Sequence, residues 1–189
     1  MALLSLGDLE SAPTDIREAL QGRLPVNLYR VMMHAPTALR AFLAFASRMA
    51  ANKVGKQLRE VIILRIAAIR GIGYVLHQHR QLAAAMGFRA AKIAAIEAGD
   101  HLSTELCDTE RALMRVAEEL TLEGRASRRA YDALAHYFTP EQIIEAVMIA
   151  GQYFMLGAFL STFEVEVEAE GEISAEAYLA RTDLKPKIL

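Results

Sequence analysis

Hydrophobic residues recur every three or four positions along most of this chain, which predicts an all-α protein. Between 37 and 51 the pattern is that of an amphipathic helix. Between 56 and 70 it is almost continuous, with Arg65 the only polar residue from Val61 to Ile69, so most of that helix should be buried. Further helices are predicted after Pro13 and at 27–34, 74–86, 89–98, 109–120, 127–138, from Thr139 past Phe163, and at 175–179.

Glycine, proline and small polar residues mark where these helices begin and end. Gly71 and Gly73 separate the helix at 56–70 from the next one. Thr139-Pro140-Glu141 combines a capping residue, a proline at the first helical position and an acid in the first turn. Asp108 or Thr109 is predicted to cap the helix that follows.

A length of 189 residues predicts a single helical domain over 1–189, in which 1–25 and the polar tail 171–189 are peripheral. Residues fifty positions apart show a weak similarity, such as Glu60 with Glu110, which indicates a possible duplication of a helical unit.

Charge and cysteine content exclude several classes of function. The 21 basic and 23 acidic residues give a net charge of −2, without the clustered basic excess of a nucleic-acid-binding protein. Cys107 is the only cysteine, so the chain has no intramolecular disulfide, no Cys-x-x-Cys redox pair and no thiolate-rich zinc site. We expect a reducing compartment, the cytoplasm.

The segment from Ala146 to Phe163 contains eighteen residues without a charge. Its length approaches that of a membrane span, but Gln152, Tyr153 and two glycines interrupt it, and acidic residues bracket it closely. We therefore predict a buried or subunit-interface helix and no membrane contact.

Glu60 and His79 are the strongest candidates for chemistry. Positions 72, 75 and 79 share one helix face, which places His79 beside the aliphatic Ile72 and Val75. A partly desolvated imidazole of this kind is suited to proton transfer near neutral pH. The alternative is a buried histidine that hydrogen-bonds a backbone carbonyl.

A carboxylate at the head of an apolar helix needs a partner, and Glu60 has two candidates. Lys56, one turn earlier, would form an ordinary surface pair. In the functional interpretation Glu60 faces His79 across the helix pair. Tyr74 either hydrogen-bonds a substrate oxygen or packs with its hydroxyl at the surface.

His77 and His79 lie about 200° apart around a helix, so they cannot bind one metal ion from the same face. We predict no metal and no cofactor. Arg59, Arg70 and Arg80 are near enough in sequence to bind a substrate carboxylate, but the sequence does not choose among them.

The segment EVIILRIAAIRGIGYVLHQH, from Glu60 to His79, and the run LAAAMGFRAAKIAAI that follows resemble the carboxymuconolactone decarboxylase and alkylhydroperoxidase D (AhpD) superfamily. The likeness covers residues 30–170. It implies an AhpD-like bundle of helices that forms symmetric oligomers, dimers to hexamers, with the active site near a subunit contact. Ile143 to Phe163 is the expected contact region.

In peroxidase members of that superfamily, the segment carries a glutamate, a Cys-x-x-Cys pair and a histidine. The cysteine positions fall on Ile72 and Val75 here, and the histidine falls on His79. Peroxidase chemistry requires a thiolate, so we expect none.

The resemblance then implies a lyase-like decarboxylase acting on a small carboxylated metabolite. His79 would be the general acid and base, Glu60 its orienting partner and Tyr74 an oxygen donor. The alternative is a non-catalytic oligomer of the same fold that binds a small molecule.

Overall fold

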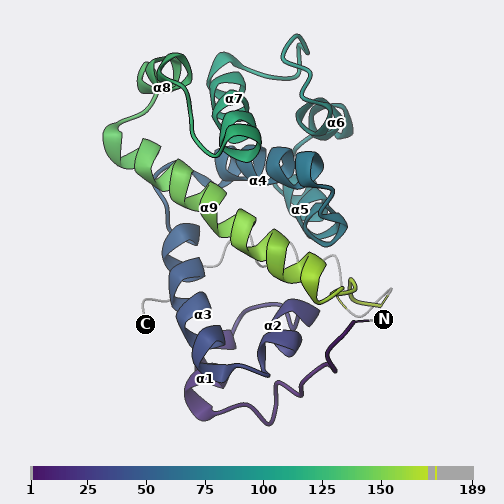
Figure 1. Ribbon diagram of the computed structural model, residues 1–189. Helices are drawn as coiled ribbons and strands as arrows, with labels where there is room; N and C mark the ends of the chain where they lie inside the picture. The colour runs from purple at the N-terminus through teal and green to yellow at the C-terminus, as the bar shows by residue number, and fades with distance from the viewer. Residues whose placement is uncertain (1, 170–172, 174–189) are drawn as a thin grey trace. The chain divides into compact units, whose positions relative to one another are not determined.

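A computed structural model describes residues 2–169 and 173 of the chain, and every regular element in these residues is a helix. The predicted all-α fold is thus confirmed. The helices are α1 (Thr14–Leu20), α2 (Asn27–Met32), α3 (Pro36–Ala50), α4 (Lys56–Arg70), α5 (Gly73–Ala85), α6 (Ala90–Ala98), α7 (Asp108–Glu123), α8 (Arg128–Ala135) and α9 (Pro140–Thr162) (Figure 1). The short helix predicted at 175–179 lies outside the described residues.

The backbone divides into two compact units. One contains the described residues up to Ala51 and those from Phe159 onward, and the other spans Asn52–Ala158. Helix α9 belongs to both by sequence, since the boundary falls between Ala158 and Phe159. The prediction of a single domain over 1–189 stays a prediction.

Helix α4 is the centre of the unit 52–158, where it packs against α5, α6 and α7 (Figure 1). Its apolar run explains this position, because a helix that is hydrophobic on nearly every side must be surrounded. Arg65 does not break the pattern, since its guanidinium donates to Glu118 and to the carbonyl of Glu97, both at 2.7 Å. The core around α4 includes Val61, Leu64, Ala83, Phe88, Ala95, Ile96, Leu106 and Met114.

Gly71 ends α4 in the left-handed conformation, with a φ of 64°, which glycine adopts without a Cβ penalty. The other glycine of the predicted break, Gly73, is already the first residue of α5, with Ile72 as its N-cap. The turn between the two helices is therefore tighter than predicted, and it brings the head of α5 directly against the end of α4.

Helix α7 begins one residue before the predicted start, and its N-cap is Cys107 instead of Asp108 or Thr109. The physical reason is Glu110, whose carboxylate accepts the Cys107 N–H at 3.0 Å and so satisfies one of the free donors at the helix start. Glu110 also pairs with Lys92. Glu110 is thus a capping residue, a different task from that of Glu60, its counterpart in the weak repeat.

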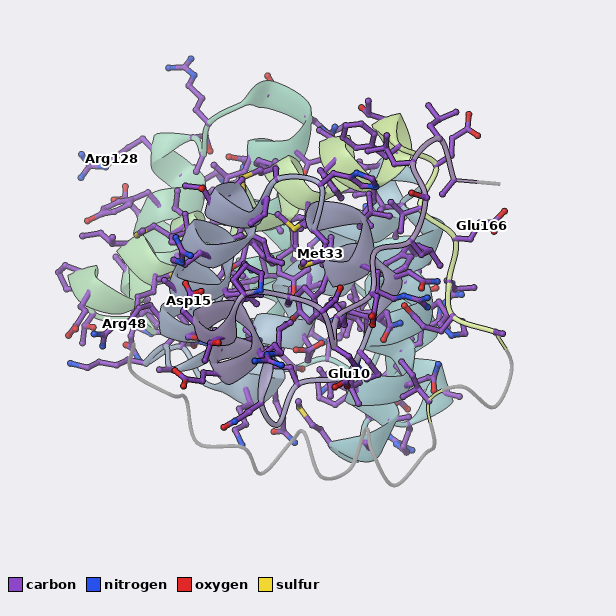
Figure 2. The ribbon with its side chains drawn as sticks, turned by 90° about the horizontal axis from the view of Figure 1, so that it is seen from below. Glu10, Asp15, Met33, Arg48, Arg128 and Glu166 are labelled. Carbon is purple, nitrogen blue, oxygen red and sulfur yellow. The ribbon has the colours of Figure 1, made fainter. Side chains whose placement is uncertain are left out.

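In the other unit, α1 and α2 pack against α3. Ile16 of the leading segment and Leu39 and Leu43 of α3 have no exposed surface. Asp15 of α1, labelled in Figure 2, pairs through its carboxylate with Arg40 of α3. Residues 1–25 therefore add a buried contact and an ion pair to this unit.

Helix α9 is anchored where it begins, because Lys53 pairs with Glu141 at 2.8 Å and the Gln142 side chain donates to the Lys53 carbonyl at 2.8 Å. Among the described helices, α9 alone is long and apolar enough to cross a membrane by length and composition. A core helix of a protein without a membrane span passes the same test.

Candidate functional site

The structure brings Glu60 and His79 into direct contact. Glu60 lies in the second turn of α4, His79 lies at the middle of α5, and the Nδ1 of His79 is 2.5 Å from the Oε2 of Glu60. Glu60 has no exposed surface and His79 is 7% exposed. The pair is therefore nearly isolated from water, where electrostatic interactions are strong.

Arg59 is the second partner of Glu60. Its Nε and Nη2 donate to the Oε1 of Glu60 at 3.2 Å and 2.9 Å. Burial alone would raise the pKa of Glu60, but the imidazole of His79 and the guanidinium of Arg59 outweigh it and lower the pKa to about 2. Burial would likewise lower the pKa of Arg59, but Glu60 and Tyr153 outweigh it and raise the pKa.

The ionised state of Glu60 fixes the proton on His79. A carboxylate only accepts hydrogen bonds, so the Nδ1 of His79 must carry a hydrogen and donate it. In the neutral imidazole the Nε2 is then an acceptor. Glu60 therefore holds His79 in one tautomer, as the aspartate of a serine-protease triad holds its histidine.

The Nε2 of His79 faces Tyr153 of α9. The Tyr153 hydroxyl lies 3.0 Å from Nε2, and the two rings meet edge to face with centroids 5.1 Å apart. With a neutral His79 the hydroxyl donates to Nε2. The site is thus a polar chain of four side chains, Arg59, Glu60, His79 and Tyr153, which we name the relay.

Contacts along α9 hold Tyr153 in place. Phe154 lies under the guanidinium of Arg70, 5.9 Å from its ring centroid. One turn later, Gly157 passes so close to Ile72 that a Cβ added there would lie 2.3 Å from the Ile72 Cδ1. Sequence reasoning missed Tyr153 as a site residue. The available signal was its hydroxyl within the charge-free segment 146–163, since such a group needs a buried partner.

The other residues considered from the sequence, Tyr74 and His77, lie on α5 together with His79. Tyr74 is buried in α5, five residues before His79 and so about 140° around the helix. The role predicted for it stays a prediction. His77 is exposed and contacts Gln81 at 2.9 Å. Ile72 and Val75, at the cysteine positions, are both 3% exposed, so aliphatic side chains fill those places.

The two alternatives, a backbone carbonyl as the partner of His79 and Lys56 as the partner of Glu60, do not describe the hydrogen bonds of these side chains. Both nitrogens of His79 meet side chains, and both oxygens of Glu60 meet Arg59 or His79. Of the other two arginines considered, Arg80 forms a bidentate pair with Glu97 at 2.7 Å. Arg59 is therefore the arginine that belongs to the site.

The described residues contain no group of three or more histidine, cysteine, aspartate or glutamate side chains placed to hold a metal ion. Cys107 is exposed at the start of α7 and is the only thiol of the chain.

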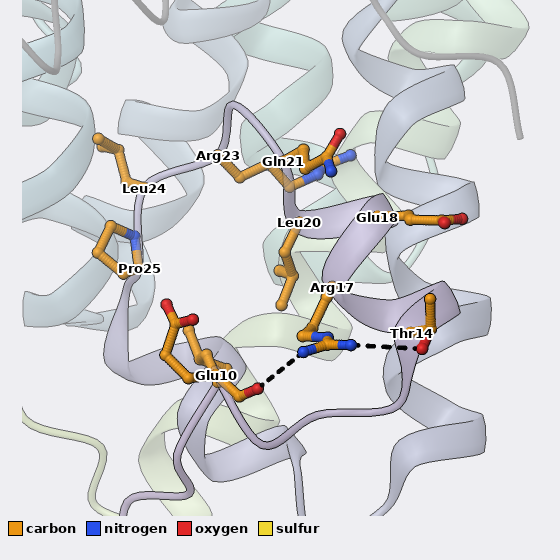
Figure 3. Close-up of a pocket in the computed structure, with 10 residues that line it drawn as sticks. Glu10, Thr14, Arg17, Glu18, Leu20, Gln21, Arg23, Leu24 and Pro25 are labelled. Carbon is orange, nitrogen blue, oxygen red and sulfur yellow. Dashed lines mark hydrogen bonds between the residues drawn. The ribbon is translucent and has the colours of Figure 1, made fainter.

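A cavity of about 500 Å³ lies in the other unit, beside α1 (Figure 3). Leucine, proline and charged side chains line it. Arg17 donates across it to the carbonyl of Glu10 and to Thr14, both at 3.3 Å. None of the predicted site residues contributes to its lining.

Comparison with known proteins identifies the family. Residues 36–119, which contain both Glu60 and His79, match the model of the carboxymuconolactone decarboxylase family. Through this segment the chain is similar to the carboxymuconolactone decarboxylase and AhpD-like superfamily. No curated protein sequence matches it closely.

Solved structures of the superfamily share the fold. An uncharacterised peroxidase-related protein with an AhpD core from Ralstonia eutropha JMP134 has a TM-score of 0.80 at 17% identity, over 92% of this chain and 96% of that one. The debrominase Bmp8 has a TM-score of 0.77 at 20% identity, over 94% and 96%. A peroxidase-related protein from Silicibacter sp. TM1040 has a TM-score of 0.77 at 17% identity, over 92% and 95%.

Proposed function

We propose that this superfamily member catalyses a cofactor-free acid–base reaction, a decarboxylation or a related lyase or isomerase step, on a small carboxylated metabolite. His79 supplies and removes the proton, and Glu60 orients it. The observation that carries the proposal is the 2.5 Å contact between the two buried side chains. Tyr74 remains a proposed oxygen donor.

The chemistry fits these surroundings. Decarboxylation next to a conjugated carbonyl group needs an apolar pocket for the carboxylate and an acid that protonates the resulting dienolate. A histidine held in one tautomer by an ionised carboxylate can alternate between the acid and the base form. The carboxylate of Glu60, 2.5 Å from the Nδ1 of His79, accepts the Nδ1–H hydrogen bond in both the neutral and the protonated form of the imidazole.

The proposal does not include a thiol-dependent reaction, although two of the similar structures are peroxidase-related. Ile72 and Val75 occupy the cysteine positions and cannot form a thiolate. The debrominase Bmp8 has been solved with 2,3,4-tribromopyrrole, a small planar molecule. That precedent supports a small, flat substrate for the same fold.

The proposal is tested by turnover of carboxymuconolactone and close analogues with the wild-type protein and with His79→Gln. General acid–base catalysis contributes about 10² to 10⁴ in rate, so the variant should lose at least that share of kcat. His77→Gln is the matched control, because it removes an exposed imidazole two residues away. Equal rates for the wild type and His79→Gln would remove His79 from the mechanism.

A non-catalytic small-molecule binder is the second candidate, and one observation favours it. Arg59, Glu60, His79 and Tyr153 satisfy one another within the protein, as a purely structural network would. A binder should show a rise in melting temperature with carboxymuconolactone and no turnover by any variant.

We also propose that the protein works in the cytoplasm as a homo-oligomer. The lone Cys107 suits a reducing compartment. The apolar side chains of Ile144, Met148 and Met155 on α9 are 60%, 41% and 52% exposed, and they support a subunit contact within the expected region Ile143–Phe163.

A further inference from the structure

Tyr153 occupies the outer end of the relay. Exposure increases from Glu60, which has no exposed surface, through His79 with 7%, to Tyr153, which is only partly buried, as Arg59 is at the other end. Both nitrogens of His79 are engaged, Nδ1 by Glu60 and Nε2 by the Tyr153 hydroxyl. A bound molecule therefore reaches Nε2 only by displacing that hydroxyl.

Two basic side chains, Arg59 and His79, interact with Tyr153. Arg59 of α4 interacts electrostatically with Tyr153, and His79 of α5 contacts its hydroxyl, with Glu60 behind both. A guanidinium beside a phenol favours the phenolate, because opposite charges stabilise each other strongly where little water screens them. An imidazolium at Nε2 would add a hydrogen bond to the same oxygen.

We propose that Tyr153 is the catalytic residue that exchanges a proton with the substrate, and that His79 resupplies it from behind. The inference rests on the proposed function and names which group touches the substrate. Arg59 acts through Tyr153 as a positioning residue that stabilises the phenolate.

The proton balance closes for both directions of transfer. In a decarboxylation the bond to the carboxylate breaks, CO2 leaves, and the electron pair remains in the conjugated carbonyl system. Tyr153 donates its hydroxyl proton to the dienolate carbon, and the imidazolium of His79 donates its Nε2 proton to the phenolate oxygen. Solvent then reprotonates His79, so one proton is consumed and no redox partner is needed.

In an isomerisation the same groups first act as a base. The Tyr153 oxygen takes a C–H proton from the substrate while its own proton moves to the neutral Nε2 of His79. The later step returns that proton by the same route. The hydrogen on the Nδ1 of His79 stays there throughout, donated to Glu60, and this preserves the tautomer needed for both directions.

The first test measures carboxymuconolactone turnover by full-length Tyr153→Phe. We expect kcat to fall about 10²-fold or more while KM changes little, since removing a general acid slows chemistry more than binding. Tyr137→Phe is the matched control, because Tyr137 also meets a histidine edge to face, His136, but is 44% exposed. Tyr153→Phe at the wild-type rate, beside an inactive His79→Gln, would overturn the proposal.

The second test needs no substrate. Difluorotyrosine is placed at position 153 of the full chain, and its phenolate absorbance is followed against pH. Arg59→Gln should move the ionisation midpoint upward, and Arg59→Lys, which keeps the charge, should restore most of the difference. The same label at position 137 should not respond to either variant.

The two proposals fail in different ways. A wild-type protein without turnover argues against the proposed function and leaves the titration to decide whether Arg59 and Tyr153 act together. The ionisation midpoint of the label at position 153 can also stay unchanged in Arg59→Gln while circular dichroism shows an intact fold. That result overturns the role of Tyr153 even if the wild-type protein is active.

Discussion

At the scale of single residues, the central feature is a carboxylate kept ionised in the interior. Burial of Glu60 would normally favour its protonated form, and the neighbouring imidazole and guanidinium reverse that preference. A buried carboxylate of this kind depends on its partners, because removing one of them leaves an uncompensated charge. The same dependence makes stability at low pH a probe of the site.

We expect the free energy of unfolding to report the ionisation of Glu60. Its pKa is lowered from 4.5 to about 2 in the folded state, so its contribution is complete above pH 4.5 and is lost as the pH falls toward 2. The shift corresponds to about 3 kcal/mol. The difference in unfolding free energy between the wild type and Glu60→Gln, from urea denaturation, should therefore shrink between pH 5 and pH 2.

Glu123→Gln serves as the control for this titration, because it removes an exposed carboxylate from α7. Its unfolding free energy should stay within about 0.5 kcal/mol of the wild type. A constant difference between the wild type and Glu60→Gln across the same pH range would show that Glu60 is not held ionised by its neighbours.

At the scale of elements, the site depends on how closely α9 approaches the head of α5. Gly157 lies against Ile72, which stands at one of the superfamily's cysteine positions. The isoleucine side chain at position 72 therefore has two consequences here. It offers no thiol, and it fills the space that a side chain at 157 would need.

Gly157→Ala should destabilise the protein by about 1 to 3 kcal/mol, the usual cost of overpacking a filled interior. The added methyl would lie 2.3 Å from the Cδ1 of Ile72, the atom that Ile72→Val removes. The double variant should therefore recover much of the loss, as measured by urea unfolding in a double-mutant cycle.

Gly73→Ala is the matched control, since a Cβ there meets no atom within 4 Å. It should be neutral or slightly stabilising, because alanine loses less backbone entropy in a helix than glycine. Additive effects of Gly157→Ala and Ile72→Val would contradict the proposed contact between the two elements.

At the scale of the whole molecule, α9 also presents an apolar seam. Ile144, Met148, Gly151 and Met155 follow one another at spacings of four, three and four residues, and all are exposed. This is the spacing by which two helices pack along a shared stripe. A second copy of the chain would bring the same stripe and could cover it by two-fold symmetry.

Met148→Glu should therefore lower the oligomeric state toward the monomer, because a carboxylate buried in an apolar contact lacks a partner. Sedimentation velocity across a concentration series measures the change. Leu122→Glu is the control, since Leu122 is 70% exposed on α7, away from the seam. A wild-type protein that sediments as a monomer at all concentrations would exclude the contact.

The sequence by itself determined the helices and the first half of the site. The helix 56–70 was predicted at its observed bounds, because a local hydrophobic period and its glycine stop are properties of neighbouring residues. Other observed helix boundaries differ from the predicted ones where a side chain caps the helix, as Glu110 does by accepting the Cys107 N–H. Glu60 and His79 were predicted because the segment that contains both resembles a known family.

Only the tertiary structure decided how the site is completed. Tyr153 lies 74 residues from His79, and no local pattern shows which hydroxyl of the charge-free segment 146–163 will meet an imidazole. The choice of Arg59 over Arg80 depended likewise on which carboxylate each could reach, Glu60 or Glu97. Local periodicity fixes which residues are buried, whereas the packing of α9 against α5 fixes which of them touch.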